Sequence, residues 1–143
     1  MIGIVVIAHG GLAAELLAAT EHVVGPLPAA KAIGVAPSDD ALALAAEVDA
    51  AVAEVDDGDG VALVTDMLGG SPANLALGVL GQGRREVIYG ANLPLLVKLA
   101  KSRRTDLAEA AEAAVEAGRK YVDSAGRILA ARRLRAGAGA GAA

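Results

Sequence analysis

Short runs of β-branched and other apolar residues alternate along this chain with longer segments rich in alanine and leucine. Such alternation is typical of a parallel sheet, in which each strand is followed by a helix that packs on one face. The apolar runs predict strands near residues 2–8, 31–35, 60–65 and 86–90. We therefore expect an α/β fold, doubly wound, with a mainly parallel open sheet of four core strands and helices on both faces.

The segments between and after these runs predict helices over roughly 12–24, 39–55, 71–80, 93–100 and 106–122. In the first helix, the apolar stripe expected to face the sheet consists of Leu12, Leu16, Ala19 and Val23. The corresponding stripe of the second helix consists of Ala41, Leu44, Val48, Val52 and Val55. Ser71 is expected to cap the third helix, with Pro72 at its first helical position.

The chain has 143 residues and a net charge of -4, which suits one folded domain of ordinary size. We expect this domain to occupy residues 1–131. Residues 132–143 begin with a basic cluster and continue as alternating alanine and glycine, a composition that cannot bury a core. They are predicted to form a disordered tail.

Composition argues against several classes of function. The chain has no cysteine and only two histidines, far apart in the sequence, so we expect neither a metal nor another cofactor. Its acidic balance and its lack of Phe and Trp argue against a nucleic-acid partner. Apolar runs too short for a membrane span, and an N-terminus without signal-peptide features, predict a cytoplasmic protein with no direct membrane insertion.

A histidine and an aspartate follow two of the predicted strands. His9 closes the first strand, and Asp66 follows the third. Because the carboxyl ends of parallel strands share one edge of the sheet, these side chains should meet there. A carboxylate that accepts one ring N–H fixes the imidazole tautomer and leaves the other ring nitrogen free to attack. The other histidine, His22, lies within a predicted helix and is expected at the surface or in a dimer contact.

Glycines accompany both of these strand ends. Gly10 and Gly11 follow His9, and Gly70 and Ser71 stand at the start of the third helix. Their backbone N–H groups, with the Ser71 hydroxyl, are predicted to bind phosphate oxygens. The chain has neither a P-loop nor a Gly-x-Ser-x-Gly elbow, so His9 itself is the predicted nucleophile of a phosphoryl transfer. Reversible, noncovalent binding of an anion at the same edge is an alternative.

Three segments carry a family resemblance: Ile4 to Gly10, Asp66 to Asn74 and Gly90 to Leu96. In this order they resemble the mannose-type IIA domain of the bacterial phosphoenolpyruvate-dependent sugar phosphotransferase system, over about residues 1–122. The resemblance implies a phosphocarrier whose phosphate is held transiently on His9, at Nε2, with Asp66 as the partner that orients the ring. It also implies a homodimer completed by exchange of a C-terminal strand.

The resemblance names partners as well. Phosphate would come from the phosphocarrier HPr and pass to a IIB component during sugar transport. No IIB sequence follows the tail, so the acceptor is expected either on a separate chain or to be absent. The alternative is a regulatory IIA protein, in which the phosphorylation state of His9 controls the binding of a regulatory protein.

Overall fold

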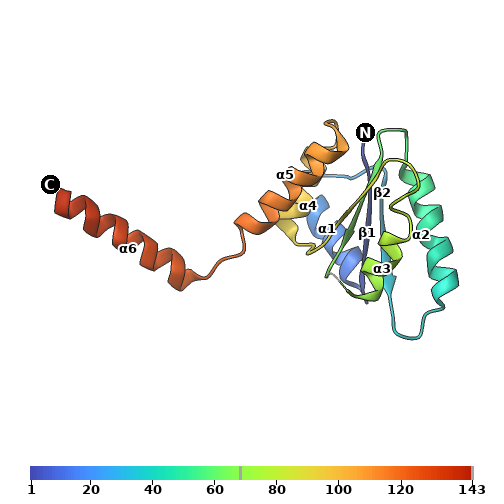
Figure 1. Cartoon of the computed structure of the whole chain (residues 1–143), viewed down its shortest axis with the longest axis horizontal. Helices are drawn as coiled ribbons and strands as arrows, with labels where there is room; N and C mark the ends of the chain where they lie inside the picture. The colour runs from blue at the N-terminus through green and yellow to red at the C-terminus, as the bar shows by residue number, and fades with distance from the viewer. Residues whose placement is uncertain (68, 143) are drawn as a thin grey trace.

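The computed structural model describes residues 1–67 and 69–142 of the chain (Figure 1). Its sheet contains β1 (Gly3–His9), β2 (Ala30–Val35), β3 (Val61–Thr65) and β4 (Arg85–Ile88). All neighbouring strands are parallel, in the order β2-β1-β3-β4. The predicted open parallel sheet of four strands is confirmed.

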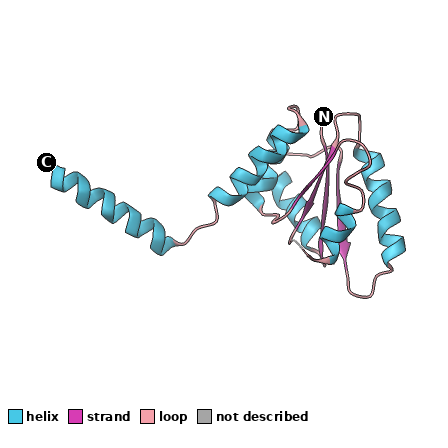
Figure 2. Ribbon diagram, viewed as in Figure 1, coloured by secondary structure: helices cyan, strands magenta, loops and turns pink. Residues whose placement is uncertain are grey.

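Helices cover both faces of this sheet (Figure 2). The helices of the described chain are α1 (Leu12–Val24), α2 (Ala41–Val55), α3 (Ser71–Leu77), α4 (Leu93–Lys101), α5 (Leu107–Lys120) and α6 (Ala125–Ala142), of which α1 to α5 cover the sheet. Buried residues of α1, α4 and α5 pack on one face, whereas those of α2 and α3 pack on the other. The doubly wound arrangement predicted from the sequence is confirmed. Within the described residues, no helix combines the length and the apolar composition needed to cross a membrane.

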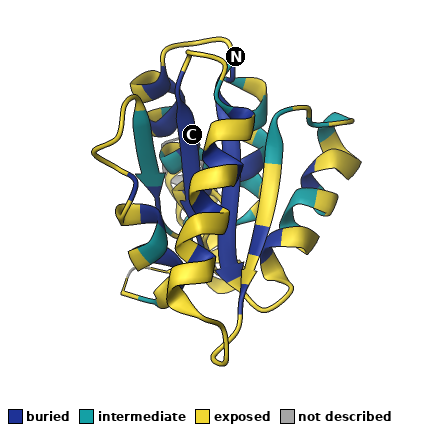
Figure 3. Cartoon of the chain, turned by 90° about the vertical axis from the view of Figure 1, so that its right-hand side faces the viewer, coloured by how far each residue is buried: buried dark blue, intermediate teal, exposed yellow. Residues whose placement is uncertain are grey.

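The central strand β1 is buried from Gly3 to Ala8, and the central strands form the dark interior in Figure 3. Its side chains alternate between two apolar clusters: Ile4 and Val6 face α1, α4 and α5, while Val5 and Ile7 face α2 and α3. A strand covered on both faces requires a continuous apolar run, which is what the sequence has here. Only the last residue of β1, His9, is exposed.

The predicted inward stripe of α1 is partly wrong. Leu12 and Val23 are 42% and 57% exposed, whereas Ala13 and Thr20 are buried. The helix is rotated so that the small Ala13 side chain meets the sheet. Thr20 tolerates burial because its hydroxyl donates a hydrogen bond to the carbonyl of Leu16 at 2.7 Å. The apolar periodicity thus predicted where the helix lies in the sequence but not which of its faces packs on the sheet.

The start of α3 also differs by one position from the prediction. Gly70 is the N-cap and Ser71 is the first helical residue, with no side-chain hydrogen bond at the cap. Proline fits any position in the first turn, because the N–H groups there have no acceptor within the helix. The presence of Pro72 therefore did not fix the register of the helix start.

The C-terminal segment is helical where the sequence predicted a disordered tail over residues 132–143. Helix α6 runs from Ala125 to Ala142, across the expected domain boundary at residue 131, and extends away from the sheet (Figure 1). Alanine and arginine both have high helix propensity, which favours this conformation without any packing partner. Residue 143 lies outside the described residues. Residues 121–124 link α5 to α6.

A buried arginine ties the opposite end of the sheet together. Arg103, between α4 and α5, is 5% exposed. Its Nε donates to the carbonyl of Ile2 at 2.7 Å, and its Nη2 donates to the carbonyl of Ala29 at 2.8 Å. The N–H of Ile2 donates in return to the Arg103 carbonyl at 2.8 Å. One side chain thus joins the residues before β1 and β2 to the α4–α5 turn.

Replacing Arg103 by methionine should destabilise the protein, because it preserves volume but removes both donors. We expect Arg103→Met to lower the free energy of unfolding by about 2 kcal/mol, since a buried acceptor that loses its donor costs roughly 1–3 kcal/mol. Urea denaturation followed by circular dichroism measures this change. Arg104→Met, at the exposed neighbouring position, is the control and should stay within about 0.5 kcal/mol of the parent. Equal effects of the two substitutions would contradict the structural role of Arg103.

Candidate functional site

The candidate site lies where the direction of the chain connections reverses. β1 and β3 are neighbours, and β1 leads into α1 on one face while β3 leads into α3 on the other. In open α/β sheets, the crevice outside the carboxyl ends of two such strands is the preferred place for ligands. His9 is the last residue of β1, and Asp66 directly follows β3. The structure brings these two side chains together, as the sequence predicted.

Two hydrogen bonds join His9 to Asp66. The Asp66 Oδ2 atom lies 2.7 Å from His9 Nδ1 and also accepts the backbone N–H of His9 at 3.0 Å. Because an ionised carboxylate only accepts hydrogen bonds, the proton of the neutral ring is on Nδ1. The lone pair is then on Nε2. The His9 side chain is 51% exposed, whereas that of Asp66 is 12% exposed. In its neutral form the ring therefore presents Nε2 to solvent, with the orienting carboxylate beneath it.

The electrostatics of the pair favour an ionised Asp66. Burial acts to raise the pKa of Asp66, but the hydrogen bonds from the His9 backbone and ring and from the Met67 N–H outweigh it. The Met67 N–H donates to Oδ1 at 2.9 Å, so both carboxylate oxygens are occupied. The net effect holds the pKa of Asp66 below its ordinary value. A negative charge therefore stays beside the ring at neutral pH and can stabilise positive charge that develops on it.

Glycines shape the turns on either side of this pair. Gly10 has φ +58° and Gly69 has φ +89°, conformations that other residues rarely adopt. The N–H of Gly10 donates to the carbonyl of Val35 at 2.9 Å, which fastens the turn after His9 to the end of β2. A side chain on Gly34 would overlap the carbonyl oxygen of Gly10. Sequence reasoning missed Gly34, although a glycine inside a strand is a known sign of close backbone approach.

The four predicted phosphate-binding residues lie on the same sheet edge. Gly11 is the N-cap of α1, and no side chain caps this helix. The positive end of the 13-residue α1 dipole is therefore next to His9 in the chain. Gly70 approaches the His9 ring. The exposed Ser71 borders a small cavity of about 360 Å³, which is also lined by residues of the β2–α2 loop but not by His9.

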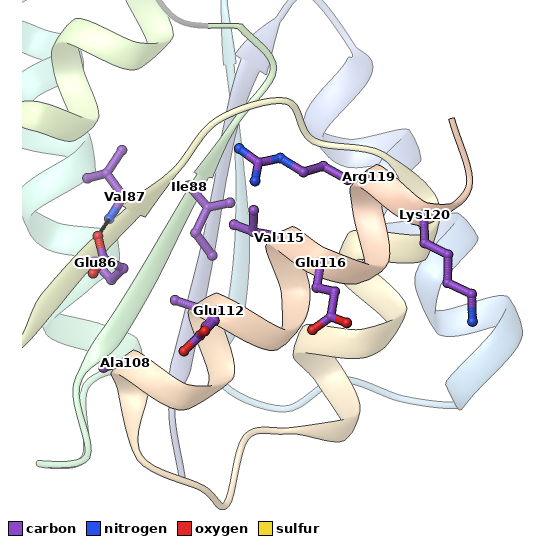
Figure 4. A pocket seen from close by; sticks show the side chains of 10 residues that line it. Glu86, Val87, Ile88, Ala108, Glu112, Val115, Glu116, Arg119 and Lys120 are labelled. Atoms are coloured by element: carbon purple, nitrogen blue, oxygen red, sulfur yellow. Dashed lines mark hydrogen bonds between the residues drawn. The ribbon is translucent and has the colours of Figure 1, made fainter. Parts of the chain in front are cut away.

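Larger cavities lie away from His9. A groove of about 760 Å³ runs between β4 and α5 (Figure 4), and another of about 680 Å³ lies among α1, α4 and α5. His9 and Asp66 line neither groove. Across the described residues, no group of His, Asp and Glu side chains has a geometry that would hold a metal ion. The His9 side chain is 51% exposed, so the pair lies at an open edge of the sheet.

Comparison with known proteins matches most of the chain to one family. The family described as "PTS system fructose IIA component" (EIIA-man) matches residues 3–117 of the chain. The mannose-specific EIIAB component of the phosphotransferase system (PTS) of Escherichia coli strain K12 is 36% identical over 124 residues. That match covers 85% of this chain but 38% of the relative, so the chain spans well under half the length of this relative.

Solved structures agree in fold. The PTS IIA protein associated with the fucose utilization operon of Streptococcus pneumoniae is 28% identical, with a TM-score of 0.78. The similarity covers 89% of this chain and 95% of that chain. The mannose/sorbose-specific IIA subunit from Enterococcus faecalis is 26% identical, with a TM-score of 0.78 and coverage of 86% and 93%.

The lowered pKa of Asp66 predicts a specific acid sensitivity. In the parent, the ionised carboxylate stabilises the fold above the pH at which an unfolded aspartate titrates, about 4. This contribution is lost as the pH falls further, through the lower pKa of the folded state. The difference in unfolding free energy between the parent and Asp66→Asn should thus shrink as the pH falls below about 4. Urea denaturation of both proteins at a series of pH values below 5 measures it, and a difference that grew as the pH fell below about 4 would contradict the assignment.

Proposed function

The chain belongs to the EIIA-man family of the sugar phosphotransferase system, and on that premise we propose that it is a histidine phosphocarrier. In this proposal His9 accepts a phosphoryl group from phospho-HPr and passes it to a IIB component. The observation that carries the proposal is the hydrogen bond between His9 Nδ1 and Asp66, because it leaves Nε2 unprotonated at an exposed edge.

The transfer step follows from this geometry. The Nε2 lone pair attacks the phosphorus of the donor phosphohistidine and forms the new P–N bond. The P–N bond of the donor breaks, and its electron pair returns to the donor nitrogen. The proton stays on Nδ1, shared with Asp66, whose negative charge stabilises the positive charge that the phosphorylated ring acquires. Transfer to the acceptor is the same exchange in the opposite sense.

Backbone groups are proposed to receive the phosphate oxygens. The N–H groups of Gly10 and Gly11, at the start of α1, and those of Gly70 and Ser71, with the Ser71 hydroxyl, are the candidate donors. The four loops at this edge, residues 9–12, 35–41, 66–71 and 89–92, contain no lysine or arginine. A site without a cationic side chain is poorly suited to capture a free anion reversibly. It is better suited to a phosphoryl group that arrives bound to a partner and is then held covalently.

The surroundings of His9 also suit a protein partner. Three apolar side chains at the starts of the loops and helices on this edge are exposed: Leu12 by 42%, Met67 by 58% and Leu93 by 36%. Exposed apolar side chains gathered on one edge are typical of surfaces that dock another protein. We propose that HPr and the acceptor protein bind this surface in turn.

The proposal predicts an acid-labile phosphate on one residue. Incubation with phosphoenolpyruvate, enzyme I and HPr should add one phosphoryl group to the parent protein, observed by intact mass. His9→Ala should abolish the label because the nucleophile is gone. Asp66→Asn should slow phosphorylation by about 100-fold or more, because the ring loses the group that fixes its tautomer.

The matched control is His22→Ala, which removes the other histidine. His22 is exposed on α1, so this variant should be labelled like the parent. Labelling of His9→Ala at the parental rate would refute the assignment of His9. An unlabelled parent that binds inorganic phosphate reversibly would instead favour the noncovalent alternative.

A homodimer, which the family resemblance implies, is the second part of the proposal. Among the residues that the structure describes, β4 pairs with β3 on one side only. The N–H of Val87 donates to the side chain of its own neighbour, Glu86, at 3.0 Å (Figure 4). Beside this edge lies the groove of about 760 Å³ between β4 and α5. The groove is lined by both charged and apolar residues. An open strand edge next to such a groove is suited to pairing with a second chain. We propose that a second copy covers β4 through its C-terminal segment.

The dimer is tested by light scattering coupled to size exclusion. The parent should have twice the 14.1 kDa mass of one chain. Val87→Lys should shift the protein toward the monomer, because a lysine on an edge strand opposes pairing. Leu42→Lys, at a position that is 82% exposed on α2, is the control and should remain dimeric. A monomeric parent would overturn the dimer proposal and leave the chemistry of His9 untouched.

A further inference from the structure

Two adjacent glycines near the site are required for different reasons. Gly69 has φ +89°, and a side chain there would meet nothing within 4 Å. Glycine is therefore needed at this position for its positive φ and not for space. Gly70 has φ -85° and ψ 167°, an extended conformation that any residue adopts. Its glycine identity must have another cause.

That cause is the imidazole of His9. A Cβ atom on Gly70 would lie 3.0 Å from His9 Cε1 and 3.6 Å from Nε2. The first distance is tighter than most Cβ contacts in proteins, so the ring would have to move by a few tenths of an ångström. Asp66 holds the neighbouring Nδ1 at 2.7 Å. The His9 ring thus lies between the Asp66 carboxylate, which accepts its hydrogen bond, and the backbone of Gly70, which has no side chain.

We infer that Gly70 is a positioning residue, which keeps the reactive edge of the His9 ring in place and accessible because it lacks a side chain. This inference rests on the proposed phosphocarrier function for its kinetic consequence. It goes beyond the phosphate-binding role assigned to Gly70 above, because it concerns the unphosphorylated ring. A methyl group at this position would either lengthen the Nδ1–Asp66 hydrogen bond or displace Nε2 from the path of the incoming phosphorus.

The kinetic effect of Gly70→Ala should be substantial. A misplacement of about 1 Å in a reacting group can cost about 100-fold in rate. For a shift of a few tenths of an ångström, we expect phosphorylation by phospho-HPr to slow by about tenfold. Gly81→Ala is the matched control, because a Cβ at Gly81 meets nothing within 4 Å and its φ is not positive. It should be phosphorylated at the parental rate.

Two further measurements separate positioning from a general loss of structure. Nitrogen NMR of the unphosphorylated protein should show shifted His9 ring resonances in Gly70→Ala and parental ones in Gly81→Ala. In urea denaturation, Gly70→Ala should lower the midpoint in the parent but not in a His9→Ala background, because the ring that the methyl group meets is then absent. If Gly70 merely supported the start of α3, Gly70→Ala would lower the midpoint in the His9→Ala background as well.

Each outcome bears on the inference. Parental phosphorylation rates together with unshifted ring resonances in Gly70→Ala would overturn it, as would an equal loss of stability in both backgrounds. If the parent itself accepts no phosphate, the proposed function fails. The ring resonances and the paired denaturation experiment then still decide whether Gly70 positions His9.

Discussion

The hydrogen bond between His9 Nδ1 and Asp66 Oδ2 decides which ring nitrogen of His9 is free to react, and the proposed chemistry depends on it. It exists because β1 and β3 are paired in one register, with Ile7 opposite Thr65, so that both chains leave the sheet at nearly the same level. A slip of one residue in either strand would turn its side chains to the opposite face. The two apolar clusters prevent such a slip, since alternate residues of both strands belong to different faces.

The site also depends on residues that contribute no functional group. Gly10 provides the left-handed turn after His9, and Gly34 leaves room for the Gly10 carbonyl. Gly70 leaves room for the ring itself. These positions differ in what they require: Gly10 needs conformational freedom, whereas Gly34 and Gly70 need the absence of a side chain. The geometry of one histidine is thus set by a carboxylate and by space around the backbone.

The carboxylate could be predicted from the sequence, whereas the space around the backbone could be predicted only in part. The strands were predictable because a buried parallel strand requires a continuous apolar run, and the meeting of His9 with Asp66 follows from the shared edge of parallel strands. The inward face of α1 was not predictable, because it depends on the distance between packed elements. At Gly34, a glycine inside a strand signals a close backbone approach, but that the approaching group is the Gly10 carbonyl follows only from the packing. The helical C-terminal segment was missed because its glycines suggested a disordered chain, while its alanines and arginines favour a helix.

The openness of the site is itself an argument for a relay. An enzyme that acts on a small molecule gains rate by enclosing it and excluding water, whereas the His9 ring is half exposed and lines neither of the two grooves described above. In the proposed relay, donor and acceptor proteins must reach the same nitrogen in succession, which a closed cleft would prevent. The loops at this edge carry no lysine or arginine. A carrier that bound its phosphate too strongly would not release it. In the proposed relay, backbone N–H groups and a single carboxylate behind the ring would provide the weaker, directional support that transfer in both directions needs.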